Sequence, residues 1–331
     1  MGFGSATQFA LLWIRVLFTV AASAEARGTV PQGARAMPRL PRLRHVAYTL
    51  ALGVYCSSWT IYGAVGSVVR EGWNYLPIYL APLLMLVLAP AFLRRLAEAV
   101  AQEQATTSSD FIAARFGHDV KVARLVSLIA RAGSVAYMAL QLRSIGNALA
   151  IVTGLPVVVP TMVAAAVLLA VFAILFGARR FERAGRSEGM IYAIGLESAI
   201  KLVALALVGF LAISMLSQVS QVQWMAGAQR LAERFQPAQL SFETWVIALI
   251  SACAVLVLPR QFYMALVEAH QPSDLPRARW GLAAYLGVMA LLVLPIALAG
   301  VIVLGGHVAP DFYVLNLPLV SGHGLIAAAA L

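Results

Sequence analysis

Small polar residues interrupt an apolar stretch near the start of the chain, at 54–66 (VYCSSWTIYGAVG). The stretch contains a thiol, three hydroxyls and two glycines, at Cys56, Ser57, Ser58, Thr60, Gly63 and Gly66. This composition suits a helix that unwinds within a membrane, where freed carbonyls and hydroxyls can hold an ion or a small polar solute. It also suits close packing of helices through small residues, which is the commoner use of such residues. The stretch alone leaves both interpretations open.

Three charged residues lie deep in other apolar segments. At about 1.5 Å per residue, Arg131 lies about 15 Å along its predicted helix, and Glu197 and Lys201 lie about 12 and 18 Å along theirs. Glu197 and Lys201 are four residues apart, in the order that favours an ion pair on one helix face. A charge at such depth costs about 2.5–3.5 kcal/mol on insertion scales, so we predict that all three face the bundle interior and are paired. A polar pathway or gate and a structural ion pair would both explain them.

The common signatures of enzymes are missing from the sequence. We find no glycine-rich phosphate loop and no metal-ligand spacing among the five histidines, His45, His118, His270, His307 and His323. We therefore expect no catalytic residues, no enzymatic activity and no metal site from these residues. The two cysteines, Cys56 and Cys253, both lie in apolar segments, so a disulfide framework is not indicated.

Composition indicates a membrane protein. Of 331 residues, 61% are hydrophobic and only 11% are charged, whereas soluble domains are about a quarter charged. The segments 155–177 and 281–304 contain no charge and exceed the roughly 18 apolar residues that mark a transmembrane helix. We predict an all-α, polytopic membrane helix bundle. Its eight expected spans are 8–24, 46–67, 75–93, 122–150, 157–177, 189–216, 242–258 and 281–304.

The basic residues are distributed over alternate loops instead of one patch. The formal charge of +10 therefore indicates membrane topology and a lipid bilayer as partner, with no nucleic acid. Most arginines fall in one set of loops, and the opposite loops hold only Arg70, Arg230 and Arg234. By the positive-inside rule, the N-terminus lies outside.

Several segments together resemble the sodium:solute symporter family. They are 54–66 with 70–82, 107–117 (TSSDFIAARFG), 188–201 (EGMIYAIGLESAIK) and 258–280 (LPRQFYMALVEAHQPSDLPRARW). More narrowly, they resemble the proline-permease-like membrane module at the N-terminus of bacterial hybrid sensor histidine kinases. The resemblance implies an extra N-terminal helix with a basic cytoplasmic connector at 1–45 and a partial symporter-like domain at 46–331, in a bacterial inner membrane.

The resemblance also implies where the site lies. The core would be two inverted five-helix repeats, with a broken helix at 54–66 and its repeat partner around 244–258. Ser57 and Trp59 would lie near the solute, and Gly53 and Cys56 near a sodium site. The candidate solute- and ion-binding residues are Gly53, Cys56, Ser57, Ser58, Trp59, Gly63 and Gly66, of which the last two would allow the break.

Two departures from the family bear on Na+ as the coupling ion. Tyr55 stands where sodium–proline transporters of this family carry an aspartate. The hydroxyls that complete the family's sodium site would lie on a helix beginning near Gly324, and the chain ends at Leu331. The chain is thus expected to be truncated at its C-terminus, and both departures count against sodium coupling.

Three functions are compatible with these observations. The first is cation-coupled transport of a small polar solute, for example an amino acid such as proline or histidine. The second is solute sensing by the membrane input domain of a two-component system, with a fused or associated histidine kinase as partner. The third is an inactive, truncated fragment. The solute and the oligomeric state are not specified by the sequence.

Overall fold

The computed structural model describes residues 12, 15–16, 19–20, 41–174, 188–237 and 240–331. Within these residues every regular element is helical, which confirms the all-α prediction. The expected span at 8–24 and most of the basic connector lie outside the described residues. The shorter helices are α2 (Pro41–Ala51), α3 (Ala64–Glu71), α4 (Leu76–Leu88), α5 (Pro90–Gln102), α6 (Ser108–Arg115), α8 (Val158–Phe172), α10 (Gln221–Ala232), α11 (Phe242–Val257), α12 (Pro259–Phe262), α14 (Tyr313–Val320) and α15 (Gly324–Ala330).

Three of the described helices are long and apolar enough to cross a membrane. They are α7 (Val120–Thr153), α9 (Glu188–Leu216) and α13 (Asp274–Ala299), which continues to His307. Two bent pairs pass the same test when each is taken as one span, Leu43–Tyr55 with Trp59–Leu88 and Phe242–Val257 with Pro259–Val267. The described part of the chain therefore carries three to five candidate spans. The described part of α8 has 15 residues, and the chain from residue 175 to 187 lies outside the described residues.

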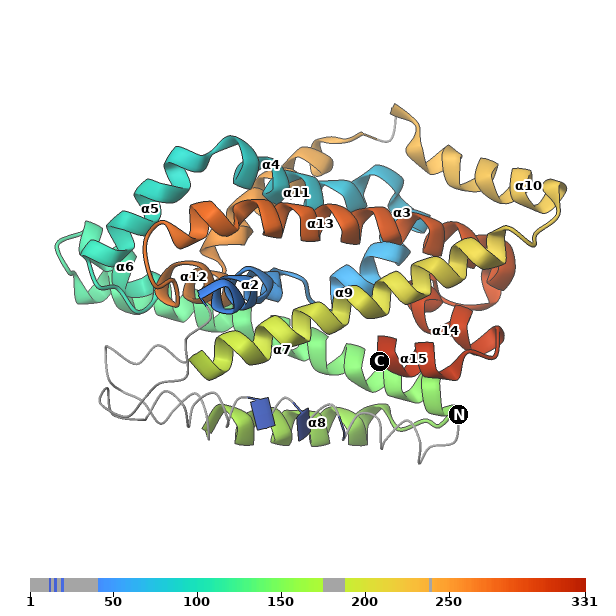
Figure 1. Ribbon diagram of the computed structural model, residues 1–331, viewed down its shortest axis with the longest axis horizontal. Helices are drawn as coiled ribbons and strands as arrows, with labels where there is room; N and C mark the ends of the chain where they lie inside the picture. The colour runs from blue at the N-terminus through green and yellow to red at the C-terminus, as the bar shows by residue number, and fades with distance from the viewer. Residues whose placement is uncertain (1–11, 13–14, 17–18, 21–40, 175–187, 238–239) are drawn as a thin grey trace.

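The long helix α13 is the centre of the bundle. It packs against α9, α4, α3 and α2, while α11 packs against α4 and α2 against α9. Figure 1 shows α13 running through the middle of the bundle. Four of its fully buried residues, Leu282, Leu286, Met289 and Val293, recur every three or four positions and so share one helix face. In contrast, α7 and α8 pack mainly on each other at the periphery.

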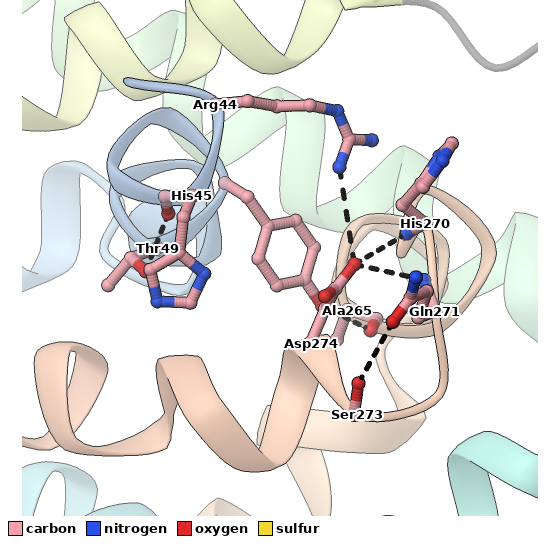
Figure 2. Close-up of polar contacts among 9 residues, drawn as sticks. Arg44, His45, Thr49, Ala265, His270, Gln271, Ser273 and Asp274 are labelled. Carbon is pink, nitrogen blue, oxygen red and sulfur yellow. Dashed lines mark hydrogen bonds and ion pairs between the residues drawn. The ribbon is translucent and has the colours of Figure 1, made fainter. Parts of the chain in front are cut away.

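The loop before α13 ties this central helix to α2. One carboxylate oxygen of Asp274 accepts hydrogen bonds from the backbone amides of His270 and Gln271, both at 2.9 Å. Arg44 reaches from α2 toward the same oxygen, with its Nη1 atom 4.0 Å away (Figure 2). A carboxylate in the first turn also suits the positive end of the helix dipole. This contact fixes the beginning of α2, the helix that leads into the broken segment.

Candidate functional site

The first bent span leaves helical geometry in the stretch where the sequence allowed it. After α2 the chain tightens into a 3-10 helix at Leu52–Tyr55, is extended at Cys56, and resumes as a π-helix at Trp59–Gly63. The two halves differ in direction by 72°. Close packing is present as well, since a Cβ on Gly53 would lie 2.9 Å from Ser198 Oγ. Unwinding and small-residue packing therefore occur together.

The two later glycines of this stretch do not make the break. Gly63 has ordinary helical angles (φ −62°, ψ −32°), and Gly66 lies within α3. A Cβ on Gly63 would overlap the Trp59 ring, and one on Gly66 would overlap the Asp311 carboxylate. Neither glycine is thus the point at which the chain unwinds, and the prediction that they allow the break stays a prediction. They are small because other side chains need the space.

A second break faces the first. Helix α11 ends at Val257, and α12 begins with Pro259 after a bend of 46°. Proline at a first helical position lacks only an amide hydrogen that would have no partner there, so a new helix begins there readily. The bend lies at the end of the segment expected to be the repeat partner, and the inverted repeat itself stays a prediction.

Side chains from the second break satisfy the backbone of the first. Gln261 Nε2 donates to the carbonyl of Leu52 at 3.2 Å, and Arg260 Nη2 donates to the carbonyl of Tyr55 at 3.3 Å. Leu52 lies in the 3-10 helix and Tyr55 ends it, and an unpaired carbonyl where the helix stops is costly where water is excluded. These two bonds therefore join the breaks and stabilise both.

The charged pair of α9 lies against the same segment. Lys201 Nζ donates to the carbonyl of Cys56 at 3.0 Å and forms an ion pair with Glu197 at 2.8 Å. The predicted pairing of these two residues is confirmed. From α7, the Gln141 side-chain oxygen accepts from the amide of Ser58 at 3.2 Å.

Arg131 does not join this group. Its side chain is exposed on α7, a helix that packs chiefly against α8 and α6. An α-helix turns about 100° per residue, so Arg131 lies on a different face from Gln141, the α7 residue that reaches the break. The prediction that Arg131 faces the bundle interior is wrong, because a depth estimate says nothing about direction.

Several of the residues that meet here carry little signal in the sequence. Arg260 and Gln261 directly follow an apolar span and a proline, which was the available signal. The Arg260 guanidinium carbon also lies 4.2 Å from the centre of the Tyr137 ring, an attractive cation–π geometry. Tyr137 and Gln141 lie four residues apart on one face of α7, but the sequence around them does not indicate which segment that face contacts.

An ion pair holds the end of α3, beyond the first break. Both terminal nitrogens of Arg70, at the end of α3, donate to the Asp311 carboxylate, at 2.8 and 2.9 Å. Asp311 lies in the loop before α14, and the tyrosine hydroxyl of Tyr62 donates to the carbonyl of Ala330 in α15. The hairpin formed by α14 and α15 is thus held against the broken span at two points.

Exchanging the charges of this ion pair tests it. Arg70→Asp alone places two carboxylates together and should lower the free energy of unfolding by about 1 kcal/mol, since both side chains are partly exposed. Combining it with Asp311→Arg should restore most of the loss, as measured by thermal unfolding in lipid nanodiscs. Additive losses in the double variant would show that the bridge contributes nothing.

The residues predicted as the site are therefore only partly assembled around the break. Glu197 and Lys201 lie beside Cys56, and Gly63 leaves room for the Trp59 ring, whereas Gly66 and Arg131 lie in other surroundings. Comparison with models of protein families, with curated proteins and with solved structures gave no match.

Proposed function

We propose that this chain binds a small polar solute at the first break and carries it across the membrane by alternating access. The observation that supports this proposal is the meeting of two discontinuous helices at their breaks, with polar side chains gathered between them. Non-helical backbone within a membrane is tolerated where it is buried in protein or lines a cavity, and transporters bind substrates at such points. The proposed setting is a bacterial inner membrane, with the N-terminus outside.

Two hydroxyls at the break are available to a solute. Ser57 and Ser58 are only partly buried, and neither side chain makes a hydrogen bond to any residue that the structure describes. The half-buried ring of Trp59 follows directly and lies 6.4 Å from that of Tyr79. Hydroxyls beside an aromatic ring can orient a small amphipathic molecule such as an amino acid.

The proposal is tested by substituting Ser57. In nanodiscs, equilibrium dialysis with a panel of labelled amino acids, proline and histidine included, should identify a ligand. Ser57→Trp should abolish its binding because the bulky ring fills the break. The matched control is Ser214→Trp, since Ser214 is exposed on α9 and a larger side chain there has room. Unchanged binding in Ser57→Trp would place the ligand elsewhere and contradict the proposal.

Uptake into proteoliposomes separates transport from the other candidate functions. Accumulation of the bound solute inside the vesicles would support transport. Binding without uptake would support solute sensing that informs a fused or associated histidine kinase. Neither binding nor uptake in any buffer would support the inactive fragment.

A further inference from the structure

The resemblance to sodium symporters implies a sodium ion beside Gly53 and Cys56. The hydrogen bonds of these two residues show whether their carbonyls could coordinate such an ion. A sodium site in an unwound helix is built from acceptor oxygens, mainly carbonyls. The Gly53 carbonyl accepts the amide of Cys56 at 2.9 Å. The Cys56 carbonyl accepts the Lys201 ammonium at 3.0 Å. The carbonyl that would coordinate a sodium ion is thus already bound to the ammonium group of Lys201.

The two other carbonyls at the break also accept hydrogen bonds from side chains of the protein. The carbonyl of Tyr55 accepts from the guanidinium of Arg260, and the carbonyl of Leu52 accepts from the side-chain amide of Gln261. A free metal ion among these carbonyls would lie close to both the ammonium and the guanidinium. Like charges repel strongly at such separations in an interior of low dielectric constant. The carbonyls at the break, with an ammonium and a guanidinium beside them, therefore do not fit a sodium ion.

Lys201 is well placed to act as a permanent substitute. Its side chain is mostly buried, with 18% exposed, and the Glu197 carboxylate at 2.8 Å holds it by an ion pair within one helical turn. The ammonium therefore reaches the break from a rigid helix, and its position does not depend on ion concentration. A lysine ammonium is a compact point charge, closer in character to an alkali cation than a guanidinium is.

We infer that the Lys201 ammonium takes the place of a metal cation at the first break, so that the chain folds and binds its solute without Na+. The part about the solute rests on the function proposed above. The part about the ion concerns the protein alone, and it can be measured without any solute.

The test removes the tethered cation and asks whether a free one replaces it. In Lys201→Ala, the Cys56 carbonyl and the Glu197 carboxylate remain as acceptors without their donor. Thermal unfolding of the full chain in nanodiscs is followed in NaCl and in choline chloride of equal ionic strength. The wild-type Tm should be the same in both salts, and the Tm of Lys201→Ala should rise saturably with NaCl alone.

Lys121→Ala is the matched control, because Lys121 is exposed at the beginning of α7 and far from Lys201 in sequence. It should behave as wild type. If Lys201→Ala does not fold, Lys201→Ser supplies a hydroxyl as a further oxygen ligand and serves the same purpose. A saturable, sodium-specific rise of the wild-type Tm would overturn the inference. Insensitivity of wild type and of both Lys201 variants would overturn it too, because the lysine would then not occupy the place of a cation.

Solute binding is measured separately, with and without Na+. Equal affinity in both salts is expected. Affinity that appears only in NaCl would overturn the inference while supporting a solute-binding function. Absence of binding in both salts would count against the proposed function and leave the result of the sodium measurement standing.

Discussion

Gly72→Ala is expected to lower the free energy of unfolding by roughly 3 kcal/mol, from positive-φ strain and steric overlap combined. Gly72 has φ +57°, a region that residues with a side chain adopt only at a cost. A Cβ there would also overlap the backbone carbonyl of Arg234, and a backbone atom cannot move aside as a flexible side chain could. The turn cannot relax freely, because the Trp73 ring beside it packs edge-on against Phe235 with centroids 5.3 Å apart.

Gly154→Ala is the control for this variant. Gly154 has φ +70° and ends α7, but nothing lies within 4 Å of a Cβ at that position. It should therefore show the backbone strain alone, about 1 kcal/mol. Both variants can be compared with wild type by SDS-induced unfolding in mixed micelles. Equal losses for the two glycines would show that the contact between the turn and Arg234 does not stabilise the fold.

Arg260→Met is expected to lower the free energy of unfolding by roughly 2–4 kcal/mol. The loss combines an unpaired carbonyl at Tyr55, about 1–3 kcal/mol, with a partly desolvated cation–π contact to Tyr137, about 1 kcal/mol. Methionine keeps much of the length and apolar stem of arginine, so the change removes mainly the guanidinium. Because this side chain joins the two breaks, solute binding should weaken as well.

Arg115→Met is the matched control for Arg260→Met. The Arg115 guanidinium carbon lies 5.1 Å from the centre of the Phe111 ring, but its side chain is exposed on the short helix α6. Its loss should change stability by no more than about 0.5–1 kcal/mol, as at other exposed cation–π sites. Thermal unfolding in nanodiscs measures both. Similar small shifts for the two arginines would contradict the assignment of Arg260 as the connection between the breaks.

Local sequence patterns predicted the features that depend on neighbouring residues. The long apolar runs predicted α9 and α13, since helix formation and membrane length are properties of a single segment. The spacing of Glu197 and Lys201 predicted their ion pair, because residues four apart always meet on one helix face. The polar residues around Cys56 allowed a departure from regular helix without requiring it, and the structure has a 72° bend there.

Contacts between distant segments were beyond these patterns. Lys201 meets Cys56 across 145 residues of chain, and Arg260 meets Tyr55 across 205. How the helices pack decides which face of each helix turns toward the break. The depth of Arg131 along α7 therefore could not predict its direction, and its side chain lies exposed.

The sequence by itself indicated a helical membrane protein, with small polar residues as an interruption of one apolar segment and a charged pair on another. Only the tertiary structure decided what fills the interruption. A freed carbonyl oxygen can coordinate a sodium ion or accept a hydrogen bond from a solute or from the protein, and which of these occurs depends on the groups that other helices bring within about 3 Å. Here they bring an ammonium, a guanidinium and an amide, from Lys201, Arg260 and Gln261.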